Sequence, residues 1–252
     1  MKILNHKYLI IVFIITVILY VLYLLKDRLI WFAKIMIITL KNIKSRKKIQ
    51  KLGMNKRNLS NEDIKKYIQI SYNYLKKLNI NTNKKFKLTK ELERYLIYSR
   101  FSEKYLQELL NTIIEYIGIE NNGIKLKINY ISSRKNMQYA GFYLDEKAQK
   151  EIVLYIKNDM KINTVISVLI HECTHYLLLS NGIRLEDTNE NEYLTDITAI
   201  VLGFEKYMLE GYKFNNDVIY DSISHRIVKK DCVGYLTYKD IKYAIKEINK
   251  FT

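Results

Sequence analysis

Two histidines and a glutamate in the middle of the chain have a spacing that suits metal binding and hydrolysis. The segment reads His171-Glu172-Cys173-Thr174-His175. On a helix, residues four apart lie one above the other, so both imidazoles would project from one face. Glu172 would lie about 100° further round the helix, beside a metal rather than on it. Zinc takes imidazole nitrogens and keeps a position open for water, so the segment predicts two zinc ligands and a catalytic base.

A second polar motif follows and offers the ligand that two histidines leave missing. Asn191-Glu192-Tyr193-Leu194-Thr195-Asp196 places Glu192 seventeen residues after His175. A carboxylate can complete a catalytic zinc site, so we expect Glu192 to be the third ligand. Asp196 lies one turn later and would accept the free ring N–H of a ligand histidine, His171. Alternatively, Glu192 only completes a helix capping box that begins at Asn189.

The two motifs together, HExxH and N-E-x-x-[ST]-D, resemble the active site of the gluzincins, the thermolysin-like zinc metallopeptidases. The resemblance covers about residues 165 to 200, and no subfamily is indicated. It implies that Glu192 binds zinc and that Asp196 supports a ligand histidine. It also implies a zincin-like domain, with a small mixed sheet packed on the active-site helix. The segment between His175 and Glu192 is a few residues shorter than in thermolysin itself.

The predicted reaction is hydrolysis of a protein or peptide substrate. Glu172 would take a proton from a zinc-activated water and deliver it to the leaving amine. The developing oxyanion needs a second donor, for which His225 is a candidate. Tyr193, Tyr212 and Tyr235 are further candidates. The alternative function is a non-catalytic, zinc-stabilised sensory or binding module, in which Glu172 would have no role.

The elements that must position these residues follow the order helices, small sheet, helices. Alternation of apolar and polar residues from Ile124 to Tyr130 is typical of a half-buried strand. The other predicted strands are Ala140–Leu144 and Glu151–Lys157, and by analogy with zincins either could bind substrate along its edge. We expect helices from Ser60, with Asp63 in its capping box, and at Thr89–Tyr98, Ser102–Ile117, Asn163–Leu179, Glu190–Leu209 and Thr237–Lys250. Asn163 is the expected N-cap of its helix. This order predicts an α+β domain.

The N-terminal segment predicts a membrane anchor. Tyr8–Leu25 is an uncharged run of eighteen residues, near the lower limit for a transmembrane helix. No small-residue cleavage site follows, which favours a retained anchor over the alternative of a cleaved signal peptide. Leu29–Leu40 is shorter and contains Lys34, so an interfacial helix is expected, with a tight two-helix hairpin as the alternative. The predicted organisation is a transmembrane anchor at 1–28, a basic juxtamembrane segment at 29–57 and the metallopeptidase domain at 58–252.

The net charge of +16 is distributed unevenly. Residues 1–57 carry 13 Lys or Arg and one acid, whereas the remaining residues carry 29 against 25. A nucleic-acid-binding domain would carry its basic surface on the folded part, so no nucleic-acid partner is expected. Basic residues after the anchor predict a single-pass protein of the cell membrane whose catalytic domain faces the cytoplasm. The two cysteines cannot form a disulfide framework, and Cys173 is expected to be a packed core thiol.

Overall fold

The described part of the chain contains the candidate site but little of the N-terminal segment. The computed structural model describes residues 14–16, 20, 59–99, 101–120, 123–131, 140–146, 149–212, 215–220, 226–231 and 234–250. Contacts divide the chain into two units, Met1–Leu52 and Gly53–Thr252. Of the predicted anchor and basic segment, the described residues include only the helical residues 14–16 and Tyr20.

The second unit has the predicted order of helices, sheet and helices. Before the sheet come α2 (Asn61–Lys77), α3 (Lys90–Tyr98) and α4 (Glu103–Ile117). The sheet contains β1 (Lys125–Ile131), β2 (Gly141–Glu146) and β3 (Gln149–Lys157). After it come α5 (Ile162–Ser180), α6 (Thr188–Ala199), a π-helical turn η1 (Ile200–Phe204), α7 (Glu205–Gly211), β4 (Asn215–Tyr220), β5 (Arg226–Asp231) and α8 (Tyr238–Ile248). The α+β prediction is confirmed as a mixed, mainly helical fold with a small sheet.

Side-chain caps explain where several helices begin. Ser60 and Asp63 form the predicted reciprocal capping box at the start of α2, and Thr237 and Asp240 form another at α8. Thr89 caps α3 through the Leu92 N–H. Each cap satisfies backbone donors that have no partner within the first helical turn. The predicted N-cap of α5 was wrong, because the helix begins after Lys161 and not after Asn163.

The sheet is mixed, and its order decides which of the described strands lie at its edges. The strand order is β1–β3–β2. β1 runs parallel to β3, with Ile128 opposite Leu154, and β2 runs antiparallel to β3, with Tyr143 opposite Ile152. Of the two strands predicted to offer an edge, β3 is therefore excluded because both of its edges are paired.

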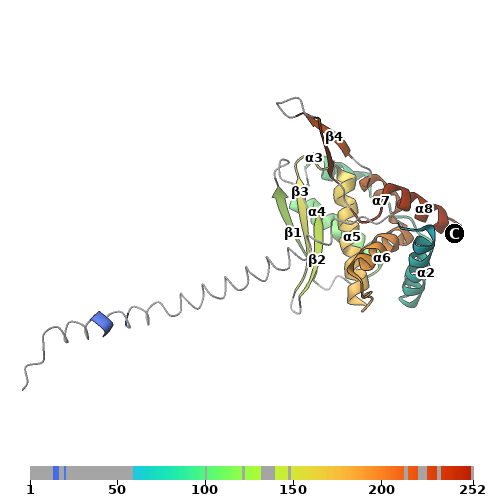
Figure 1. The fold of residues 1–252 in the computed structure, drawn as a ribbon, viewed down its shortest axis with the longest axis horizontal. Coiled ribbons are helices and arrows are strands. Elements are labelled where there is room, and N and C mark those ends of the chain that lie inside the picture. Colours follow the sequence, from blue (N-terminus) through green and yellow to red (C-terminus); the bar gives the residue numbers. More distant parts are fainter. Residues whose placement is uncertain are drawn as a thin grey trace, which may run out of the picture. The chain divides into compact units, whose positions relative to one another are not determined.

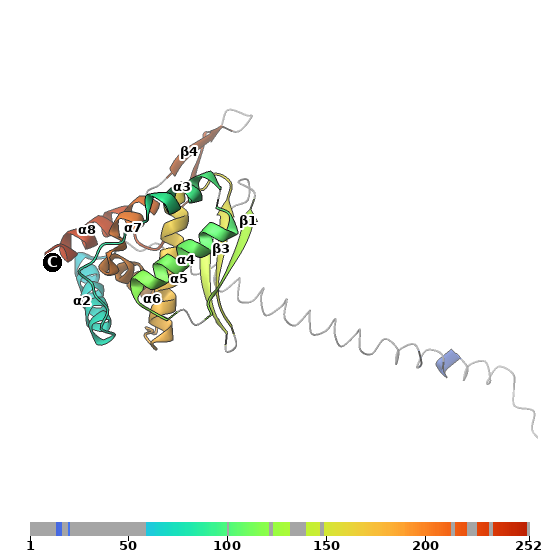
Figure 2. The same ribbon diagram turned by 180° about the vertical axis from the view of Figure 1, so that it is seen from behind.

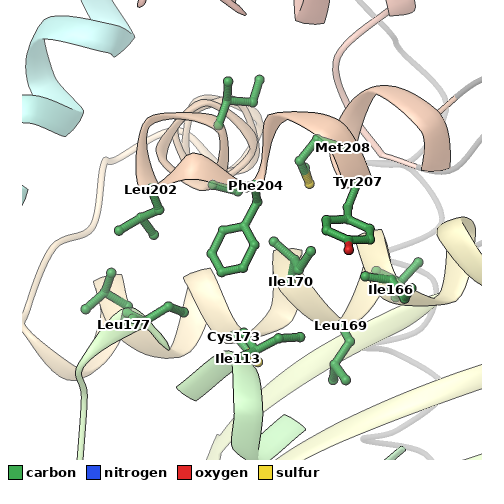
Figure 3. Packing of buried hydrophobic residues seen from close by; sticks show 14 of the residues in the cluster. Ile113, Ile166, Leu169, Ile170, Cys173, Leu177, Leu202, Phe204, Tyr207 and Met208 are labelled. Carbon is green, nitrogen blue, oxygen red and sulfur yellow. The ribbon is translucent and has the colours of Figure 1, made fainter. Parts of the chain in front are cut away.

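Helix α5 lies in the centre of the unit, between the sheet and helices α2, α6, α7 and α8 (Figures 1 and 2). One side of it packs against Phe204, Tyr207 and Met208 of the segments that follow (Figure 3), and Cys173 is a buried free thiol in the same hydrophobic core. Among the described residues, α5 alone has the length and hydropathy of a membrane span, and most of it is buried within the unit. Its apolar character is thus explained by its place in the core.

The predicted helix Glu190–Leu209 is interrupted, and this correction has a local cause. Gly203 has φ 93°, a conformation that leaves the α-helix, and lies in η1 between α6 and α7. Its carbonyl accepts a hydrogen bond from the Phe86 N–H at 3.0 Å, while the hydroxyl of Tyr116 donates to the Leu202 carbonyl at 2.9 Å. The backbone groups released at the kink are thereby satisfied from outside the helix. The kink directs α7 back along α5.

The two-stranded hairpin of β4 and β5 was not predicted from the sequence. These strands pair antiparallel, with Val218 opposite Val228. The hairpin extends away from the body of the unit (Figure 1). No tight-turn dipeptide such as Asn-Gly separates its strands, so the usual sequence signal was missing.

Candidate metal centre

Two neighbouring helices bring three potential metal ligands together. α5 carries His171 and His175, and α6 carries Glu192. The Oε2 atom of Glu192 lies 3.1 Å from Nε2 of His171 and 2.9 Å from Nε2 of His175. All three ligand atoms lie within 4.8 Å of one another. The side chains of His175 and Glu192 keep 15% and 17% of their surface exposed, so the group is accessible from one side.

The outer nitrogen of each histidine is held by a second partner on α6. Nδ1 of His171 lies 2.7 Å from Oδ1 of Asp196, which as a carboxylate can only accept. Nδ1 of His175 lies 3.2 Å from Oγ1 of Thr195, whose own hydroxyl hydrogen is donated to the Asn191 carbonyl at 2.8 Å. In a neutral ring these partners place the proton on Nδ1, so that Nε2 faces Glu192 and offers a lone pair to a metal ion or binds a proton that it donates to Glu192.

This arrangement fits a bound cation. Two Nε2 lone pairs and a carboxylate oxygen are all acceptors, and they repel unless protons or a metal ion lie between them. Ligands at about 2.0–2.1 Å from a tetrahedral zinc lie roughly 3.3 Å from each other. The contacts of 2.9 and 3.1 Å are close to that spacing. The group of His171, His175 and Glu192 could thus hold a metal ion.

Asp196 connects the site to two other parts of the domain. Besides His171, its Oδ1 accepts a hydrogen bond from the Tyr212 hydroxyl. Its Oδ2 accepts from the backbone N–H groups of Tyr235 and Leu236 at 3.0 and 3.1 Å. Asp196 is fully buried, so these four donors replace its hydration. A buried carboxylate with this many donors fixes the orientation of the His171 ring.

Glu172 lies beside the three ligands and against β2. Glu172 is only 4% exposed, and the Tyr143 backbone N–H donates to its carboxylate. A Cβ atom at Gly141 would lie 3.1 Å from Glu172 Oε1 and 2.7 Å from Val168 Cγ1. Gly141 therefore permits the close approach of the strand to α5. Gly141 was not predicted from the sequence as part of the site.

Burial and neighbouring charges shift the acid–base properties of these groups in opposite directions. Burial raises the pKa of Glu172 above its usual range, although the two histidines act against the shift. Burial also tends to raise the pKa of Glu192, but hydrogen bonds from both histidines outweigh it and hold the value well below the usual range. Burial would lower the pKa of His171, yet the Asp196 and Glu192 carboxylates together hold it well above normal. Glu172 is thus distinguished from Glu192 as the carboxylate that binds a proton more tightly.

The candidate oxyanion donors have separate environments. Tyr193 is buried and its ring lies 6.3 Å from that of Tyr67, which makes it a core residue. Tyr212 is also buried, and its hydroxyl donates to Asp196. The Tyr235 ring stacks on His171 at 5.7 Å with 20° between the planes. Burial, and then the charges of Glu192 and Glu172, raise the pKa of Tyr235, so its hydroxyl stays protonated beside the ligand group. His225 lies outside the described residues.

The alternative explanation of Glu192 as a helix cap is wrong. Asp187 is the N-cap of α6, and its side chain accepts from the N–H groups of Asn189 and Glu190 at 2.7 and 3.0 Å. Glu192 is therefore free to face α5.

Comparisons with known proteins add no relative: no protein-family model, curated protein or solved structure matches the chain.

Proposed function

We propose that this chain is a zinc metallopeptidase with His171, His175 and Glu192 as ligands. The observation that supports it best is a buried carboxylate, Glu172, which lies beside the ligand group and is not a member of it. A structural metal site has no need of such a base, whereas a hydrolytic one does. Bound zinc would supply a Lewis acid that acidifies water and polarises a carbonyl. The resemblance to gluzincins, and with it the zincin-like fold, belongs to this proposal.

In the proposed reaction Glu172 moves the proton. Its raised pKa suits a group that accepts a proton from the attacking water and then gives it to the leaving amine. The Tyr143 N–H holds one side of its carboxylate, and packing of β2 on α5 limits its freedom. The base is thereby kept in position before substrate arrives.

Among the described strands β2 pairs with β3 alone, and its other edge supports a peptide as substrate. The Tyr155 N–H donates to the Ala140 carbonyl at 2.8 Å, so Ala140 directs its carbonyl toward β3. In an antiparallel ladder the next residue directs its backbone groups the other way. Gly141 and Tyr143 therefore direct their backbone groups away from β3, and the Tyr143 N–H already donates to Glu172. An extended peptide could add beside this edge through main-chain hydrogen bonds to Gly141.

Tyr235 is the candidate donor to the developing oxyanion. Its ring is fixed by stacking on His171 and by its backbone bond to Asp196. A protonated hydroxyl held this way can donate without reorganisation when negative charge develops on the substrate carbonyl. Among the described tyrosines that were candidates, Tyr212 already donates to Asp196 and Tyr193 lies in the core.

The test compares Glu172→Gln with Glu192→Ala in the full chain, using a library of fluorescence-quenched peptides and metal analysis. The parent should hold about one zinc per chain and cleave peptides. Glu172→Gln should keep the zinc and lose turnover by a factor of at least about 10³, because the base is gone. Glu192→Ala should lose most of the zinc.

Two outcomes would contradict the proposal. A parent that remains metal-free after zinc is supplied would exclude a zinc enzyme. A zinc-loaded parent that cleaves no peptide would favour the non-catalytic sensory or binding module instead.

We also propose that residues 1–28 anchor the chain in the cell membrane, with the catalytic domain in the cytoplasm. The support is the uncharged run Tyr8–Leu25 and the excess of basic residues that follows it. Digestion of the domain by protease added outside intact cells would contradict this orientation.

A further inference from the structure

The connection between α5 and α6 decides where Glu192 lies. It spans residues 181–187 and brings Glu192 back to His175 on the preceding helix. Its first half is held to the core, because Ile183 is buried and its N–H donates to a carbonyl of α5 at 2.9 Å. The residues that follow, 184–187, are exposed or half-buried, so their conformation depends on hydrogen bonds.

The side-chain amide of Asn191 supplies these hydrogen bonds. Its Oδ1 accepts from the Leu185 N–H at 2.7 Å. Its Nδ2 donates to the carbonyls of Leu185 and Asp187 at 2.7 and 2.8 Å. An amide matches this set of one donor and two acceptors, whereas a carboxylate of the same size has no donor for the carbonyls. Asn191 therefore clamps the connection onto the first turn of α6.

The first turn of α6 lies outside the hydrophobic core. Its residues 188–192 are exposed or half-buried, and burial begins at Tyr193. A first helical turn also lacks partners for its N–H groups, and it frays unless local contacts hold it. Here the cap by Asp187 and the clamp by Asn191 are such contacts. Glu192 lies at the end of this turn, so its position depends on them.

Asn191 is linked to the candidate metal centre in two ways. Glu192 follows it directly, and Oε2 of Glu192 lies 3.1 and 2.9 Å from the Nε2 atoms of His171 and His175. Its carbonyl accepts from the Thr195 hydroxyl at 2.8 Å, and that hydroxyl lies 3.2 Å from Nδ1 of His175. Metal ligands must be held within about 0.5 Å of their working geometry. A shift of this turn would therefore displace both the third ligand and the partner of His175.

We propose that Asn191 is a positioning residue whose clamp fixes the first turn of α6 and directs Glu192 to the metal position. The proposal rests on the proposed ligand group of His171, His175 and Glu192. Asn191 acts through Glu192 and not by contact with the metal. Loss of its side chain should change the affinity and geometry of metal binding and leave the fold intact, because the core packing of α6 begins beyond this turn.

Cobalt(II) in place of zinc tests this role, because its visible absorption depends on the number and arrangement of its ligands. Metal titrations of the full chain in detergent compare the parent with Asn191→Ala and Asn191→Asp. Glu192→Ala supplies the spectrum of a site that lacks the third ligand. Asn181→Ala is the matched control, since it removes a hydrogen bond of 2.8 Å to the Leu177 carbonyl at the other end of the same connection.

The parent should bind about one cobalt per chain, and both Asn191 variants should bind it roughly 10- to 100-fold more weakly. Their spectra should shift toward that of Glu192→Ala, while their thermal unfolding stays cooperative. Asn181→Ala should match the parent in affinity and in spectrum.

Parent-like affinity and spectrum in both Asn191 variants would overturn the role of Asn191 and leave the metal site standing. Equal weakening in Asn181→Ala would overturn it too, since any loosening of the connection would then suffice. Loss of cooperative unfolding in both Asn191 variants would also overturn it, because the residue would then be needed for the fold as a whole. A parent that binds neither cobalt nor zinc would overturn the ligand group itself, and this proposal with it.

Discussion

At the scale of single residues, the site depends on how each histidine is held from behind. Asp196 holds His171 and Thr195 holds His175, and both partners come from the same turn of α6. The two contacts differ in kind, since one acceptor is a carboxylate and the other a hydroxyl. Partners of this type set the ring orientation and the basicity of the ligating nitrogen.

Thr195→Val should weaken zinc binding by roughly 10- to 100-fold, because the acceptor for the His175 Nδ1–H is removed while the shape of the side chain is kept. Thr195→Ser retains the hydroxyl and should bind zinc as the parent does. Competition with a chromogenic chelator at constant pH measures both. Equal affinities for the valine and serine variants would contradict the role given to Thr195.

Tyr235→Phe should lower kcat by roughly 10²–10³-fold and leave zinc content unchanged. Phenylalanine keeps the stacking on His171 and the backbone bond to Asp196, so only the hydroxyl is lost. Steady-state kinetics on a peptide identified from the library gives kcat and KM separately. A parent-like kcat would assign the oxyanion to another donor, with His225 the next candidate.

At the scale of elements, the kink at Gly203 determines how α6 and α7 pack on α5. Phe86, Tyr116, Phe204 and Tyr207 form an aromatic cluster at this kink, with ring centroids 4.8 to 5.5 Å apart in the contacts between them. The Lys84 carbonyl also lies against Gly203, so that a Cβ atom there would be only 2.0 Å from it. The continuous helix expected from periodicity would have displaced this chain segment.

Gly203→Ala should therefore destabilise the domain by at least about 3 kcal/mol, since backbone strain and a backbone clash add together. Gly118 provides the control, because it too has positive φ, at 80°, but nothing lies within 4 Å of its Cβ position. Gly118→Ala should cost only about 1 kcal/mol. Urea unfolding of both variants measures the difference, and equal destabilisation would show that the close approach to Lys84 is unimportant.

At the scale of the whole molecule, the domain has a large apolar core. The buried cluster includes residues of α2, α4, α5, α6 and α8 and of the sheet, and much of it lies away from the three ligands. A zinc-dependent structural module would behave differently, because its folding free energy comes largely from the metal.

Removal of zinc with a chelator should lower the Tm by roughly 10 °C and leave a cooperative transition. Zinc at a thousand times its Kd contributes about 4 kcal/mol, and a domain of this size changes by roughly 2–4 °C per kcal/mol. Differential scanning calorimetry of the zinc-loaded and chelated chain measures the shift. Loss of all cooperative unfolding after chelation would instead indicate the structural zinc module.

What could be predicted from the sequence was the local part of the structure. Capping residues and apolar periodicity depend on neighbours within a few positions, which is why the starts of α2 and α8 and the strands of the sheet were anticipated. The spacing of His171 and His175 was informative for the same reason, since one turn of α5 carries both rings on one face.

Contacts between distant segments were decided only by the tertiary structure. Three features depend on residues far apart in the chain. They are the strand order that puts β2 at an edge of the sheet, the hydrogen bonds from Tyr212, Tyr235 and Leu236 to Asp196, and the close approach of Lys84 to the kink at Gly203. Such contacts depend on how packing and burial orient whole elements, and a local pattern does not contain that information. The sequence by itself therefore determined which residues could bind a metal, and the packing of α6 on α5 decided that they meet.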